Sequence, residues 1–104
     1  MDPVEGERPV MFEIWLNDTG EVAMSGRCHA GHADVMREVL GQVSTSIEVN
    51  FAQLDYISSA GLGVLLGAQK RLSKSGHALT LVNLNAHIRE VFRIAGFDKV
   101  FEVR

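Results

Sequence analysis

Apolar and polar residues along the chain follow two periodicities. Five short stretches are rich in strand formers or alternate between polar and apolar side chains, which predicts strands at residues 10–16, 21–25, 46–51, 78–84 and 100–103. Three longer stretches have apolar residues three and four positions apart, which predicts helices at residues 32–43, at 60–73 and between Asn85 and Gly96. The turn sequence NDTG joins the first two strands into a hairpin, and Gly76 ends the second helix.

The predicted order of elements, ββαβαβαβ, places the chain in the α/β fold class. Strands that alternate with short helices predict a small mixed sheet whose central strands are parallel, with α-helices packed on it. We expect one domain at residues 9–104 and a loop at residues 26–30, because no repeat or linker divides that range. Residues 1–8 are expected to form a flexible leader, since their charged sequence lacks the apolar core of a signal peptide.

Composition and charge narrow the classes of function. With 104 residues, 46% of them hydrophobic, the chain can bury one core. The net charge of −3 and the lack of a Lys/Arg cluster argue against a nucleic-acid partner. No apolar run approaches the ~20 residues that span a bilayer, so no direct membrane insertion is expected. The single cysteine, Cys28, cannot form an internal disulfide, which fits a reducing compartment such as the cytoplasm.

Two adjacent serines lie between a predicted strand and the second predicted helix, in the sequence LDYISSAGLGVLL. Ser59 directly precedes the helical stripe, so its side chain is predicted to cap the helix by accepting a hydrogen bond from a backbone amide. The same position suits a phosphate, because the amino end of a helix carries partial positive charge and free N–H groups. A serine here is therefore either a structural cap or the site of a switchable charge.

Glycines inside the same helix allow two interpretations. Gly63 and Gly67 lie four residues apart, and this spacing alone favours close packing of the helix against another backbone. The alternative is a smooth strip on which a partner protein lies, ending in positive charge that suits acidic side chains. The strip comprises Ala60, Gly63, Gly67, Lys70, Arg71 and Lys74.

Other candidate chemistry is less well supported by the sequence. Cys28, His29 and His32 are close together, but nothing nearby supplies a convincing fourth zinc ligand, so no metal site is expected. The glycines do not match the phosphate-binding pattern G-x-x-x-x-G-K-[ST], and there is no G-x-S-x-G sequence around the serines. We therefore expect no cofactor and no catalytic residue, and the chain is predicted not to be an enzyme.

The sequence ISSAGLGVLL resembles the signature of bacterial anti-sigma factor antagonists, which are stand-alone STAS domains. The resemblance extends over nearly the whole chain, including the GRCHA loop, the approach VNFAQLDYISS, the strand SGHALTLVNL and the end REVFRIAGFDKVFEV. It implies a partner that is both an anti-sigma factor and a serine kinase of the GHKL type. The unphosphorylated protein would bind this partner and release the sigma factor.

The resemblance also implies the residues of the switch. Ser59 matches the phosphorylated position, so phosphorylation at Ser59 would turn partner binding off, and a PP2C-type phosphatase would restore it. Ser58 stands where many relatives have an aspartate, which makes it a possible second phosphorylation site, and His29 stands where many have an acid. The predicted docking surface comprises Arg27, Cys28, His29, Ala30, Ser58, Ser59, Gly61, Leu62, Gly63 and Gly67.

Three other interpretations remain open at the level of sequence. STAS domains also occur as cytoplasmic accessory subunits of membrane transporters, in which case the same helix would contact an ATPase or a permease. A partner switch can also control an output other than a sigma factor, because the partner chooses the output. The third is a small ligand-binding domain or enzyme that uses the glycine-rich helix start.

Overall fold

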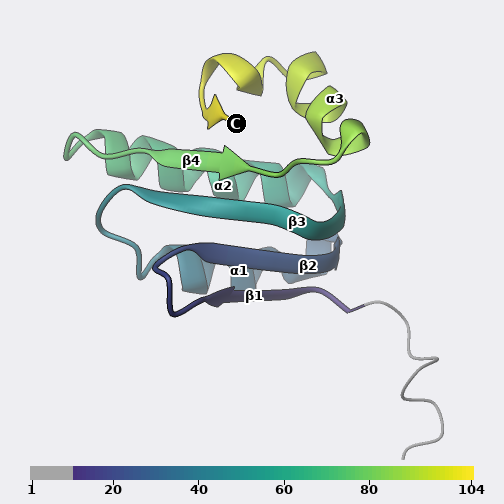
Figure 1. The fold of residues 1–104 in the computed structure, drawn as a ribbon, viewed down its shortest axis with the longest axis horizontal. Coiled ribbons are helices and arrows are strands. Elements are labelled where there is room, and N and C mark those ends of the chain that lie inside the picture. The colour runs from purple at the N-terminus through teal and green to yellow at the C-terminus, as the bar shows by residue number, and fades with distance from the viewer. Residues whose placement is uncertain (1–10) are drawn as a thin grey trace, which may run out of the picture.

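The computed structural model describes residues 11–104, so the predicted leader and the first residue of the first predicted strand, Val10, lie outside the described residues. The described chain forms one five-stranded sheet in the order β1-β2-β3-β4-β5 (Figure 1). The strands are β1 (Glu13–Leu16), β2 (Val22–Cys28), β3 (Ile47–Ile57), β4 (Leu79–Val82) and β5 (Glu102–Val103). The α-helices are α1 (Ala33–Leu40), α2 (Ser59–Ser73) and α3 (Ala86–Ile94), and the short 3-10 helices are η2 (Ala30–His32) and η3 (Phe97–Lys99).

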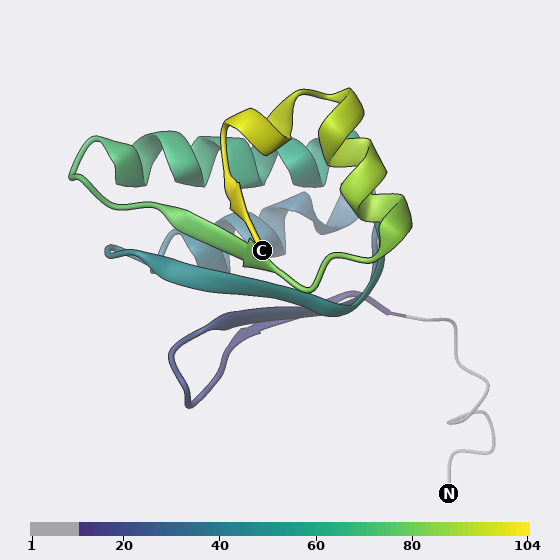
Figure 2. The ribbon, with the colours of Figure 1, turned by 45° about the horizontal axis from the view of Figure 1, so that its top comes forward.

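The sheet is mixed, as predicted. β1 pairs antiparallel with β2, while β2, β3, β4 and β5 run parallel to one another. Helices α1 and α2 contact each other and lie side by side against one face of the sheet (Figures 1 and 2). Because the parallel strands share a direction, the carboxyl ends of β2 and β3 meet at one edge, next to the start of α2.

The core lies between the sheet and these helices. Its side chains come from alternate positions of β2, from Val49, Phe51, Leu54 and Ile57 of β3, and from the inner faces of the helices. The spacing along β3 is irregular because the register with β2 shifts twice. A cluster of aromatic rings anchors α3: Phe92 meets Phe51 edge-to-face at 5.9 Å and also contacts Phe97 and Phe101 at 6.0 Å each. The apolar stripe predicted for the third helix is therefore its buried face.

The predicted ends of that helix are confirmed. The side chain of Asn85 accepts a hydrogen bond from the backbone N–H of Ile88 at 2.8 Å, which caps the start of α3. Gly96 follows the helix with a φ of 77°, a left-handed conformation that glycine adopts without steric cost.

Two strands are longer than the sequence pattern indicated. β2 continues through Gly26 to Cys28, so the predicted loop at residues 26–30 is wrong for its first three positions. β3 has eleven residues and ends at Ile57, well beyond the predicted end at Phe51. Pairing explains both, because Arg27 lies opposite Tyr56 and Cys28 opposite Ile57 in the parallel ladder. The ladder holds a polar segment that alternation alone did not identify as a strand.

Candidate functional site

The two serines at the end of β3 have different structural roles. Ser58 has an extended backbone, and its side-chain oxygen accepts a hydrogen bond from the N–H of Gly61 at 3.2 Å. Its own N–H donates to the carbonyl oxygen of Cys28 at 2.8 Å, and its carbonyl oxygen accepts from the N–H of Leu62 at 2.9 Å. Ser58 is therefore the cap of α2, and the prediction that Ser59 caps the helix is wrong by one residue.

Ser59 is the first residue of α2, and it is exposed. Because Ser58 provides the cap, the hydroxyl of Ser59 is not needed to start the helix. The first turn of α2 contains no acidic side chain, so the partial positive charge of its backbone N–H groups is not offset there. An anionic group on Ser59 would be electrostatically favourable at this end of the helix.

Gly61 allows α2 to lie directly against the ends of β2 and β3. A Cβ atom at this position would lie 2.9 Å from Cγ1 of Ile57 and 3.0 Å from Sγ of Cys28, which is too close for carbon and sulfur atoms. Gly61 is buried, as are its two neighbours Ile57 and Cys28. The absence of a side chain is thus a packing requirement at Gly61.

Gly63 and Gly67 do not pack closely, contrary to the interpretation that their spacing favoured. A Cβ atom at either position would meet nothing within 4 Å, and both residues are exposed. They form part of the floor of a groove of about 430 Å³ between α1 and α2. The groove is lined by Arg37, Leu40, Gly41, Ala60, Gly63, Val64, Gly67, Ala68 and Arg71.

Arginine side chains from both helices flank this groove. Arg71 donates a hydrogen bond to the carbonyl oxygen of Leu40 at 2.9 Å and so ties α2 to the end of α1. Arg37 of α1 forms an exposed ion pair with Asp34 at 2.7 Å. Helix α2 itself contains no acidic residue and ends in basic side chains, so the α2 side of the groove is basic in a chain of net charge −3, whereas Asp34 balances Arg37 on the α1 side. Arg37 was missed by sequence reasoning, because only the fold places its helix beside α2.

A second exposed group lies at the ends of β2 and β3. The guanidinium carbon of Arg27 lies 4.8 Å from the centre of the Tyr56 ring, within range of a cation–π interaction. His29 also belongs to this group, since its ring centre lies 5.3 Å from that of Tyr56 and 6.1 Å from that of His32. Tyr56 was not among the predicted docking residues, although it lies in the segment that precedes the serines.

Cys28 is part of the core. Its side chain is fully buried, with Sγ 3.3 Å from Sδ of Met36. Burial raises the pKa of the Cys28 thiol to about 11, although a backbone hydrogen bond from Ser58 acts in the opposite direction. The thiol is therefore neutral at physiological pH. Among residues 11–104, no group of three His, Cys, Asp or Glu side chains is arranged to hold a metal ion.

The structure brings the predicted docking residues 27–30 next to the start of α2, because η2 contacts α2, whereas Gly67 lies further along this helix. The predicted docking residues differ in accessibility. The exposed members are Arg27, His29, Ala30, Ser59, Gly63 and Gly67. The buried members are Cys28, Ser58, Gly61 and Leu62. Four of the ten predicted docking residues thus belong to the interior, and the six exposed residues are those that the structure presents at the surface.

The comparisons with known proteins agree with this fold. A family model described as "Mlab, STAS domain" matches residues 15–103, so the chain belongs to the STAS domain family. Solved structures show the same architecture. SpoIIAA in its unphosphorylated form, an anti-sigma factor antagonist, aligns over 90% of this chain and 87% of its own with a TM-score of 0.65 and 22% identity. An anti-sigma factor antagonist from Mycobacterium paratuberculosis aligns over 90% and 84% with a TM-score of 0.74 and 19% identity.

Curated relatives are also named as anti-sigma factor antagonists. The anti-sigma-B factor antagonist of Listeria monocytogenes is 29% identical over 101 residues, which cover 91% of this chain and 89% of that protein. The putative anti-sigma factor antagonist BtrV of Bordetella bronchiseptica is 46% identical over 57 residues, covering 55% of this chain and about half (49%) of that protein. The family assignment made from ISSAGLGVLL is therefore confirmed. Within residues 11–104, no helix has the length and apolarity needed to cross a bilayer.

The different roles of the two serines predict different effects on stability. Ser58→Ala removes the cap of α2 and is expected to lower the free energy of unfolding by ~1 kcal/mol. Ser59→Ala should change it by less than ~0.5 kcal/mol, because Ser59 is an exposed first-turn residue. Urea unfolding followed by circular dichroism measures both. Equal losses in the two variants would contradict the assignment of the cap.

The different surroundings of Gly61 and Gly63 predict that substitution to alanine changes the free energy of unfolding in opposite directions at the two positions. Gly61→Ala forces a methyl group against Ile57 and Cys28 and is expected to destabilise the protein by ~1–3 kcal/mol. Gly63→Ala, its matched control, enters open space and should raise the free energy of unfolding by up to ~1 kcal/mol, because alanine favours a helix over glycine. Urea unfolding of the two variants provides the comparison. Destabilisation by Gly63→Ala would mean that its face is packed.

Proposed function

We propose that the protein is a partner-switching anti-sigma factor antagonist. In its unphosphorylated form it binds an anti-sigma factor that is also a serine kinase of the GHKL type, and so frees the sigma factor. The kinase transfers a phosphoryl group from ATP to the Ser59 hydroxyl, with loss of the hydroxyl proton and release of ADP, and the phosphorylated form dissociates. A PP2C-type phosphatase restores the binding form by hydrolysis. This role requires no catalytic residue in the chain itself.

The observation that carries this proposal is the separation of the cap from the exposed serine. Phosphorylation adds about −1.5 to −2 charges at neutral pH. On Ser59 this charge lies at the amino end of α2 and leaves the hydrogen bond between Ser58 and Gly61 in place. The modification therefore changes the surface that a partner meets without removing an interaction that holds the fold. That property suits a switch.

The surface around Ser59 supports docking of a protein with acidic groups. Arg27 and His29 lie at the strand ends, and Arg37 and Arg71 flank the groove along α2. The open backbone at Gly63 and Gly67 lets a partner segment approach α2 closely. A phosphate on Ser59 would meet acidic partner groups across this surface, and both repulsion and desolvation would weaken the complex.

Ser58 does not suit the role of a second phosphorylation site in the folded protein. Only 9% of its surface is exposed, and its oxygen already accepts the hydrogen bond that caps α2. A kinase would have to disrupt the start of the helix to reach this hydroxyl. We therefore assign the switch to Ser59 alone.

A charge substitution tests the switch directly. Ser59→Asp is expected to weaken binding to a purified GHKL-type anti-sigma kinase from the same genome by at least about tenfold, because it introduces a negative charge at the docking surface. Ser59→Ala should bind at least as well as the unmodified protein. Isothermal titration calorimetry gives the affinities, and Ser75→Asp, beyond the far end of α2, is the matched control for added charge.

The kinase reaction tests whether Ser59 is the residue that accepts the phosphate. Incubation with that kinase and ATP should add one phosphate to the unmodified protein and none to Ser59→Ala, as measured by intact mass and peptide mapping. Phosphate on a residue other than Ser59, or equal affinity of the Asp and Ala variants for the kinase, would contradict the proposal.

A further inference from the structure

Strand β1 forms an outer edge of the sheet and contains neither Lys nor Pro, two residues that commonly protect an edge. Within residues 11–104 it pairs through Glu13–Leu16 with β2 alone, so its outer backbone groups face away from the sheet. Edge strands commonly carry Lys or Pro, or are very short, which discourages pairing with another chain. The opposite edge follows this rule, since β5 has two residues and Arg104 beside it pairs with Glu48 and Glu102. In β1 the only charged residue is Glu13.

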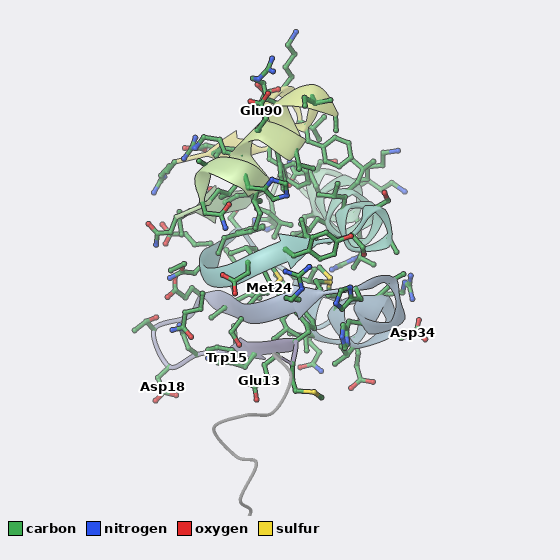
Figure 3. All side chains as sticks on the ribbon, turned by 90° about the vertical axis from the view of Figure 1, so that its right-hand side faces the viewer. Glu13, Trp15, Asp18, Met24, Asp34 and Glu90 are labelled. Atoms are coloured by element: carbon green, nitrogen blue, oxygen red, sulfur yellow. The ribbon has the colours of Figure 1, made fainter. Side chains whose placement is uncertain are left out.

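Apolar side chains gather at this edge. Met11, Trp15 and Leu16 are 62%, 38% and 56% exposed, and Val35 on the neighbouring helix α1 is 43% exposed. Figure 3 shows Glu13 and Trp15 at the β1 end of the molecule, far from Glu90 of α3. An apolar hollow of about 460 Å³ runs along the strand and is lined by Phe12, Glu13, Ile14, Trp15 and Val35. Both the backbone and the side chains of this edge thus lack a partner among the described residues.

We propose that β1 pairs antiparallel with β1 of a second copy of the chain, around a two-fold axis at Trp15. Residues opposite each other in such a ladder point to the same face, and two-fold symmetry requires each contact to occur twice. Centring the axis on Trp15 places the two indole rings side by side on the open face. On the helix face, Ile14 of each copy then meets Leu16 of the other.

Charge favours this register over its neighbour. With the axis at Trp15, each Glu13 lies opposite Asn17 of the other copy, and the two carboxylates are well separated along the strands. With the axis at Ile14, Glu13 would lie opposite Trp15, which leaves a carboxylate next to an apolar ring and separates the two indoles. The register with the axis at Trp15 places apolar side chains opposite apolar side chains, and aromatic cross-strand pairs stabilise a sheet.

The sequence before β1 has neither the composition of a partner strand nor that of an apolar cover. The ten residues before Met11 include two prolines, which cannot donate to a strand ladder, and four charged residues. Their sequence, MDPVEGERPV, offers few apolar side chains to the hollow beside Trp15. A second copy supplies what is missing, because its β1 has both the free backbone and the apolar side chains.

The dimer has a consequence for the site at Ser59, although it does not rest on the proposed function. Antiparallel pairing would extend each five-stranded sheet into one sheet of ten strands, with the β3 strands of the two copies running in opposite directions. Because α2 starts where β3 ends, the two Ser59 residues would lie at opposite ends of the sheet. Each copy would then keep its own accessible docking surface.

Sedimentation of the full chain tests the dimer. Between about 1 µM and about 1 mM, the unmodified protein should pass from monomer to dimer, and emission from its single tryptophan, Trp15, should move to shorter wavelength as the ring leaves water. Leu16→Lys should weaken self-association at least about tenfold while its circular dichroism stays unchanged. Ile94→Lys is the matched control, since Ile94 is 72% exposed on α3 and should leave the dimer intact.

Disulfide cross-linking tests the register. Trp15→Cys should form a covalent dimer rapidly on oxidation, because directly opposite residues of paired strands lie within reach of a disulfide. Leu16→Cys should cross-link far more slowly, since each Leu16 faces Ile14, and buried Cys28 should not react. A monomer at every concentration, a dimer weakened only by Ile94→Lys, or faster cross-linking by Leu16→Cys would overturn the proposal.

Discussion

The hydrogen bond from the Ser58 N–H to the Cys28 carbonyl oxygen, 2.8 Å long, determines the geometry of the site. It extends the pairing of β2 and β3 by one residue beyond the strands and thereby fixes the direction in which α2 begins. With Ser58 held there, its hydroxyl can cap the helix and its carbonyl oxygen can accept the first helical hydrogen bond. Gly61 then fits against Cys28 and Ile57 because it has no side chain.

Because the buried residues meet these structural needs, the next exposed residue is free for chemistry. Ser58 caps the helix, and Gly61 lets it pack against the strand ends. The side chain of Ser59 and the backbone at Gly63 are exposed. The same helix therefore has a constrained inner face and an accessible outer face within its first two turns. A modification on the outer face does not disturb the hydrogen bonds of the inner face.

Much of the fold was predictable because it depends on local patterns. The order of elements, the parallel centre of the sheet and the caps at Asn85 and Gly96 follow from periodicity and from residue types with strong local preferences. The length of β3 was not, because its second half is held as a strand by pairing with β2 and not by alternation of apolar and polar residues.

The site was predicted to the correct segment but not to the correct roles. Two adjacent serines satisfy the same capping rule, and only the backbone, which is extended at Ser58 and helical from Ser59, decides that Ser58 is the cap. Whether a helical glycine packs or stays open likewise depends on the placement of other elements: Gly61 faces the strand ends, whereas Gly63 faces the groove beside α1. Sequence spacing alone carries no information on that difference.

A phosphate on Ser59 is expected to change the stability of the free protein much less than the free energy of partner binding. The proposed switch needs this difference. In the free protein, a phosphate at the amino end of α2 changes stability by only ~0.3–1 kcal/mol, and in the favourable direction. In the proposed complex, the same dianion would lose water and meet acidic groups of the partner, and an unpaired buried charge costs several kcal/mol. Since ~1.4 kcal/mol is tenfold in affinity, a penalty of that size would let phosphorylation act as the proposed switch while the fold remains intact.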